Sequence, residues 1–126
     1  MKYMRYYEML YIIRPDLESE VYKSVIQKYN KIIEDNKGII TKVEEWGKRS
    51  LAYEVEKFKD GFYVLIRFCG NADLPEKLQR DFRFEERVLK FIVVKLRDKV
   101  NPEELKEKVS EEKANDEEVK VKDGGK

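Results

Sequence analysis

The sequence contains no histidine and only one cysteine among its 126 residues. The lack of histidine excludes His-based acid–base catalysis, Ser-His or Cys-His nucleophile pairs, and zinc sites that use histidine. The single cysteine, Cys69, excludes an internal disulfide and a multi-cysteine metal site, and this scarcity is typical of a reducing compartment. We therefore expect no metal, no cofactor and no catalytic residues.

Long hydrophobic runs are also missing. No stretch approaches the roughly 18 apolar residues that indicate a membrane-spanning helix, and the N-terminus lacks the continuous apolar segment of a signal peptide. We therefore expect a soluble, cytoplasmic protein without a membrane partner. Proline is scarce as well, and none lies between Ile39 and Lys57, so this stretch can form one long strand.

Charged residues, in contrast, are abundant and unevenly distributed. They make up 42% of the sequence, against about 25% in an average protein. Residues 98–126 hold seven lysines and ten acidic residues, a balance of −3, which leaves +4 for residues 1–97 out of the total of +1. The first part is therefore mildly basic, which permits nucleic-acid binding without requiring it.

The apolar residues predict four strands and two helices. Period-two alternation is typical of a strand, and three- to four-residue spacing is typical of an amphipathic helix. The predicted elements are a strand over Tyr3–Arg14, a helix from an N-cap at Asp16 to Asp35, a strand over Ile39–Lys57, a strand over Phe62–Cys69, a helix from Asp73 to about Phe84, and a strand over Val88–Leu96. Between the second and third strands, Lys59-Asp60-Gly61 predicts a tight hairpin turn.

This order of elements predicts an α+β fold, the ferredoxin-like βαββαβ sandwich, in which both helices cover one face of a four-stranded antiparallel sheet. The first and third strands are central, and the long second strand lies at an edge. We expect one domain over residues 1–97. Residues 98–126 have few large apolar side chains, so we expect a charged, disordered tail.

The predicted edge strand is unusually long. Nineteen residues at about 3.3 Å each span roughly 60 Å, so the strand must project beyond its sheet. Gly47 interrupts its alternation, where a glycine inside a strand indicates a bulge or bend. A projecting edge is either protected by charge or used for docking. Five neighbouring residues suit both roles and are our candidates for a protein-partner interface: Glu44, Glu45, Trp46, Lys48 and Arg49.

Several segments resemble one known family. The segment Val43–Tyr53, which reads VEEWGKRSLAY, is the most specific of them; Arg5–Glu8, Gly61-Phe62-Tyr63 and Val93-Val94-Lys95 follow the same family's order. Together they make residues 4–97 similar to bacterial small-subunit ribosomal protein S6. The sequence departs from that pattern at Ser50, where a basic residue often follows Arg49.

The resemblance implies a structural RNA-binding protein of the small ribosomal subunit. It further implies a heterodimer with ribosomal protein S18, and that this pair binds the central domain of the small-subunit (16S) rRNA. Basic residues at the ends and open side of the sheet are the candidates for phosphate contacts. These candidate RNA-binding residues are Arg5, Arg87, Lys90, Lys95 and Arg97.

Two other functions remain open from the residues alone. An RRM-type RNA binder uses the same strand order, and Asp60–Phe68 faintly matches its aromatic third-strand motif, although the small residue after the first aromatic is missing. A small-molecule-sensing domain of this fold needs a glycine-rich loop at the helix entry, and Arg14-Pro15-Asp16 provides none, so we expect no small-molecule substrate. An enzyme is disfavoured because Glu44 and Glu45 point to opposite faces of a strand.

Overall fold

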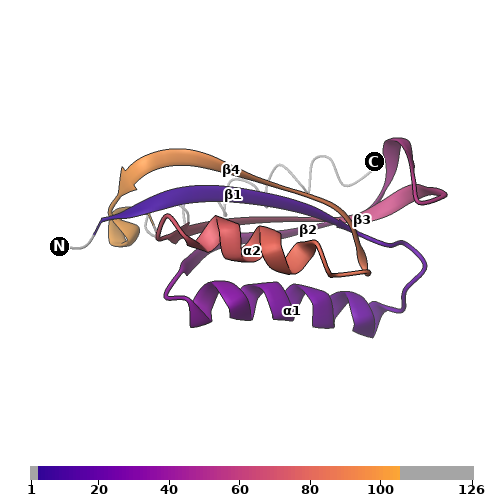
Figure 1. Cartoon of the computed structure of the whole chain (residues 1–126), viewed down its shortest axis with the longest axis horizontal. Helices are drawn as coiled ribbons and strands as arrows, with labels where there is room; N and C mark the ends of the chain where they lie inside the picture. The colour runs from indigo at the N-terminus through magenta and orange to yellow at the C-terminus, as the bar shows by residue number, and fades with distance from the viewer. Residues whose placement is uncertain (1–2, 106–126) are drawn as a thin grey trace, which may run out of the picture.

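The computed structural model describes residues 3–105 of the chain. The elements in order are β1 (Met4–Ile13), α1 (Ser19–Asp35), β2 (Ile39–Val55), β3 (Phe58–Gly70), α2 (Leu74–Phe82) and β4 (Val88–Val100). All neighbouring strands are antiparallel, in the order β2-β3-β1-β4, and both helices lie on the same side of the sheet (Figure 1). The predicted ferredoxin-like sandwich is therefore confirmed.

The core lies between the helices and one face of the sheet. Tyr11 of β1 is fully buried at its centre, and its ring lies 5.4 Å from that of Tyr29 and 5.3 Å from that of Phe82. Side chains of this size each contribute about 1.5–3 kcal/mol when they leave water. The core also contains Tyr7, Met9, Ile13, Val25, Ile33, Val64, Ile66, Phe68 and Leu78. Neither α1 nor α2 packs against the sheet's second face, which is called the helix-free face below.

Helix α1 begins later than predicted. Its N-cap is Glu18 instead of Asp16, because the Asp16 carboxylate accepts hydrogen bonds from the Arg14 guanidinium at 2.9 and 3.2 Å. The predicted stop is confirmed: Lys37 has φ 64°, and the Gly38 amide donates to the Ile33 carbonyl oxygen at 2.8 Å. A left-handed residue after the last helical turn ends a helix in this way.

The hairpin between β2 and β3 turns at Glu56-Lys57, so the prediction of a turn at Lys59-Asp60-Gly61 was wrong. Both turn residues have positive φ, 49° and 72°, the backbone that a two-residue hairpin loop requires. Gly61 instead lies inside β3, where an added Cβ would come within 2.2 Å of Ile12 Cγ2. This glycine permits a close approach within the sheet and makes no turn.

Strand β4 continues four residues past its predicted end at Leu96. Val100 pairs with Met4 and is buried, and a helical turn follows at Pro102–Leu105. Met4 and Val100 form a second apolar cluster with Tyr6 and Cys69, and Leu105 packs against this cluster. The predicted domain boundary at residue 97 therefore falls within a strand. The expected disorder of the rest of the tail, 106–126, lies outside the described residues.

Candidate partner and nucleic-acid surfaces

The candidate residues on β2 are arranged by two irregularities in its pairing with β3. The register shifts once between Ile40 and Lys42 and again between Glu45 and Gly47. Gly47 has φ 80°, a left-handed conformation that favours glycine, so the predicted bulge is confirmed. The first shift was not predicted. It places Ile40 and Val43 both against the main core, although strict alternation predicts opposite faces.

Trp46 lies on the helix-free face and is half-buried within a small cluster. Its indole stacks on Tyr63 with ring centroids 6.2 Å apart and an angle of 14° between the planes. The indole Nε1 donates a 2.8 Å hydrogen bond to Glu44 Oε2, and the Arg49 guanidinium lies 4.7 Å from the ring centroid. Trp46 is therefore held in one orientation by its neighbours.

The charges around Trp46 divide between the two faces of β2. Glu44 lies opposite Leu65 of β3, and its side chain is on the helix-free face. There its carboxylate forms an ion pair with the Lys42 ammonium at 3.1 Å. Glu45 lies on the other face, near Tyr11. The pKa of the Tyr11 phenol is raised, mainly because the phenol is buried and to a lesser extent because of the negative charge of Glu45. The structure thus agrees with the prediction that these two carboxylates point apart. Lys48 and Arg49 are exposed and extend this mixed-charge surface toward the hairpin.

The end of the β2–β3 hairpin reaches across to the opposite edge of the sheet. Strand β1 ends at Ile13, opposite Phe62, so residues of β3 before Phe62 project beyond it (Figure 1). The Tyr53 hydroxyl contacts the Lys90 ammonium of β4, whose Nζ is 4.5 Å from the ring centroid. On β3, the Phe58 ring lies 5.3 Å from the Arg14 guanidinium. Two cation–aromatic contacts therefore hold the projecting hairpin.

The five candidate RNA-binding residues do not form one patch. Arg5, Lys95 and Arg97 gather at the end of the sheet where β1 begins, because Lys95 and Arg97 pair with Tyr7 and Tyr6 of β1. Lys90 lies at the other end of β4, seven residues from Arg97, a separation of roughly 23 Å along a strand. Lys95 forms an ion pair with Asp98.

Arg87, the fifth candidate, is committed to an internal ion pair. Its guanidinium donates to the buried Glu85 carboxylate at 2.6 and 2.9 Å, and Lys28 of α1 donates to the same carboxylate at 2.8 Å. The hydrogen bonds from Arg87 and Lys28 lower the pKa of Glu85 to about 2. This cluster ties the α2–β4 turn to α1, so Arg87 stabilises the fold and its donors are largely occupied.

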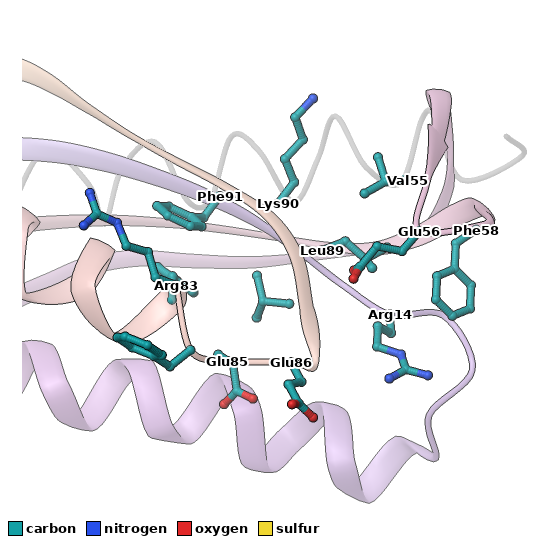
Figure 2. A pocket seen from close by; sticks show the side chains of 13 residues that line it. Arg14, Val55, Glu56, Phe58, Arg83, Glu85, Glu86, Leu89, Lys90 and Phe91 are labelled. Carbon is teal, nitrogen blue, oxygen red and sulfur yellow. The ribbon is translucent and has the colours of Figure 1, made fainter.

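An open hollow of about 920 Å³ lies between this turn and the projecting hairpin. Figure 2 shows Lys90 pointing away from the helices, while Glu85 and Glu86 point toward α1. Among its described lining residues there is no nucleophile paired with a base. Among residues 3–105 there is no group of three or more His, Cys, Asp or Glu that could hold a metal. No helix in that range is long and apolar enough to cross a membrane.

Sequence reasoning missed a smaller cavity at the other end of the sheet. It has a volume of about 280 Å³, and its lining includes Tyr3, Arg67, Arg97 and Lys99. Only Arg97 was among the candidates. The alternation of Arg97 and Lys99 near the end of β4 could have indicated a shared face, but the pairing of Met4 with Val100 that brings Tyr3 beside them is non-local.

Comparison with known proteins decides the family. The profile of the family described as "Ribosomal protein S6" matches residues 6–95. The chain belongs to the ribosomal protein S6 family. Its fold resembles the crystal structure of 30S ribosomal protein S6 from Thermotoga maritima, with a TM-score of 0.70 and 32% identity over 73% of this chain and 87% of that one.

Curated S6 relatives extend across most of the chain. The small ribosomal subunit protein bS6 of Syntrophobacter fumaroxidans is 45% identical over 100 residues, which covers 79% of this chain and 68% of that protein. The bS6 protein of Moorella thermoacetica is 37% identical over 98 residues, which covers 78% of this chain and 100% of that protein. The resemblance inferred from the motif around Trp46 is therefore confirmed, and the S6 family is one of structural ribosomal proteins.

Proposed function

We propose that this chain is a structural constituent of the bacterial small ribosomal subunit in the cytoplasm. In this role it binds the central domain of 16S rRNA together with ribosomal protein S18. Membership of the S6 family is the observation that supports this proposal most strongly. The arrangement of charges on the two edge strands supports a model in which β2 binds the protein partner and the basic end of the sheet, near β4, binds RNA.

The partner surface is the mixed-charge part of β2 around Trp46. Glu45, Lys48 and Arg49 are exposed, and the indole is fixed by Tyr63 and Glu44. A rigid aromatic ring surrounded by both signs of charge suits a protein interface, because aromatic residues and Arg supply much of the binding energy there. The surrounding charges fix the register of the partner.

The RNA surface is the basic end of the sheet formed by Arg5, Lys95 and Arg97. Arg5 and Arg97 are exposed, and no carboxylate lies within ion-pair distance of either among residues 3–105. Guanidinium groups of this kind bind phosphates by releasing condensed counterions. Lys90 is a separate contact at the other end of β4. Because three or four phosphate contacts give modest affinity, we propose that the chain needs its partner for tight binding.

Filter binding of a central-domain 16S rRNA fragment, with and without S18, tests this proposal. We expect weak binding by the chain alone and at least tenfold tighter binding of the RNA by the heterodimer. Equal affinity in the two cases would reject the cooperative model. The matched control replaces two exposed lysines of α1, Lys23→Gln and Lys31→Gln, and should leave both affinities unchanged.

The two rival functions gain no support from the geometry. An RRM-type surface needs exposed aromatic rings on the two central strands. Within the described residues, Tyr6 of β1 is 7% exposed and Tyr63 of β3 is stacked under Trp46. A small-molecule-sensing domain needs a ligand loop at the entry to α1, where Arg14 and Asp16 instead pair with each other.

A further inference from the structure

The cavity of about 280 Å³ lies on the helix-free side, at the end of the sheet where β1 starts and β4 finishes. Most of its lining lies outside the segment that the S6 family profile matches, residues 6–95: Tyr3 precedes that segment, and Arg97, Lys99, Asn101, Glu104 and Leu105 follow it. The family profile therefore covers only a minor part of the cavity's lining.

Two cations at this cavity have no carboxylate partner in the part of the chain that the structure describes. Among residues 3–105, neither Arg97 nor Lys99 has an acidic group within ion-pair distance. The third cation, Arg67, donates a 2.9 Å hydrogen bond to Glu8 on the neighbouring strand. Within the described range, the lining has three basic residues and one acidic residue, Glu104, so it carries an excess of positive charge. A phosphate group fits such a pair of cations, because Arg and Lys both donate to phosphate oxygens.

An aromatic ring stands beside these cations. Tyr3 is 50% exposed, and the Lys99 ammonium lies 4.4 Å from its ring centroid. Exposed aromatic rings next to basic groups bind unpaired bases, since every base can stack on them while the cations hold its phosphate. The opposite wall of the cavity is formed by the helical turn that follows β4. Asn101 Oδ1 caps this turn by accepting a hydrogen bond from the Glu103 amide at 3.0 Å.

We propose that this cavity is a binding site for a single unpaired nucleotide. Arg97 and Lys99 bind its phosphate, and Tyr3 contacts its base. The volume is just below the roughly 300–1,000 Å³ of pockets that enclose whole small ligands, so it suits one nucleotide unit and not a duplex. The inference deepens the proposed RNA-binding function and rests on it for the source of the nucleotide, which is an extruded base of structured RNA.

The test uses the full-length chain, isotopically labelled, and NMR titration with three probes: AMP, a single-stranded RNA hexamer, and the same hexamer in a duplex. We expect the hexamer to shift the amides of Tyr3, Arg97 and Lys99 and the duplex to leave them in place. Shifts with AMP as well would show that a free nucleotide also enters, and shifts with the hexamer alone would restrict the site to RNA.

Variants separate the pocket from general electrostatics. Arg97→Gln with Lys99→Gln, and separately Tyr3→Leu, should each weaken hexamer binding about five- to tenfold. The control, Lys57→Gln with Lys59→Gln, removes two exposed charges from the hairpin and should have little effect. Equal loss in the control, equal shifts with the duplex, or equal shifts at Tyr3 with a polyglutamate peptide would each overturn the proposal.

Failure of this inference is distinguishable from failure of the proposed function. If the pocket variants bind the hexamer normally while the heterodimer still binds the central-domain fragment, the nucleotide site is wrong and the ribosomal role stands. If the central-domain fragment is not bound with S18 present, the proposed function fails, whatever the hexamer does.

Discussion

The two edges of the sheet differ in charge more than in length. Strand β2 has 17 residues with three basic and three acidic side chains, whereas β4 has 13 residues with four basic side chains and one acidic one. The exposed apolar side chains Ile92, Val94 and Leu96 also lie on β4. A neutral edge of mixed sign discriminates between protein partners, and a basic edge attracts phosphates. This difference fits the proposal that the sheet meets a protein at one edge and RNA at the other.

The largest expected effect concerns Arg87, which precedes β4, because among the five candidate RNA-binding residues it is the one that pairs with a buried carboxylate. Glu85→Gln removes the carboxylate that Arg87 and Lys28 share. This should lower the free energy of unfolding by about 2–4 kcal/mol, because Arg87 loses its carboxylate partner while Lys28 is left with its ion pair to Asp81 at 2.9 Å. Denaturant unfolding at pH 7 measures this loss. Asp73→Asn, which removes the exposed Lys77–Asp73 pair, is the matched control and should cost little.

The same cluster predicts a pH dependence. The pKa of Glu85 is about 2 in the folded chain, below its ordinary value of 4.5, so its ionised form stabilises the fold. This contribution is fully present above about pH 4.5 and is lost as the pH falls toward 2. The difference in stability between the parent chain and Glu85→Gln should therefore shrink between pH 5 and pH 2.5. A constant difference would show that Glu85 acts through packing instead of charge.

The second prediction tests the basic edge directly. Arg5→Gln, Lys95→Gln and Arg97→Gln together should weaken binding of central-domain RNA by the heterodimer by about tenfold or more, and should reduce the slope of log affinity against log salt by about two to three. Affinity for S18 should stay the same, because these residues are remote from Trp46. A loss of S18 binding as large as the loss of RNA binding would remove the distinction between the two edges.

The third prediction tests the mixed edge. Trp46→Ala should weaken the heterodimer by about tenfold, because the indole is the central aromatic group of that surface. It should also lower the stability of the free chain by about 1–2 kcal/mol, since the stack on Tyr63 and the hydrogen bond to Glu44 are lost. Titration calorimetry with S18 and thermal unfolding measure the two effects. Tyr53→Ala is the matched exposed aromatic control, and an equal effect on S18 binding would contradict the assignment.

The sequence predicts the fold well because the order of elements follows from local patterns. Alternation and helical spacing are properties of single segments, and only one sheet topology fits their order with short, right-handed connections. The errors arose where a distant or competing contact decides. Arg14 binds Asp16 and moves the helix start, Ile12 requires Gly61 within the sheet, and Met4 extends β4 by pairing with Val100.

The candidate site is less predictable than the fold, because charge alone does not reveal the partner of each side chain. Nothing near Arg87 in the sequence indicates that Lys28 of α1 shares its carboxylate. Likewise, the stack of Trp46 on Tyr63 depends on the register that the Gly47 bulge imposes. The motif around Trp46 identifies the family, whereas the structure is needed to separate cations that pair within the fold from cations that are exposed.

The smallest expected effect concerns the contact that joins the two edges. Tyr53→Leu removes the aromatic ring and hydroxyl that meet Lys90, an exposed cation–aromatic contact that contributes about 0.5–1 kcal/mol. The melting temperature should change little, because this part of the hairpin lies outside the core. Amide hydrogen exchange in Leu51–Lys57 should instead become faster, since the hairpin loses one of its two cation–aromatic contacts. Phe58→Leu removes the other contact and should have a similar effect. If exchange is unchanged in both variants, the hairpin is held by its own backbone pairing, and the two edges behave independently.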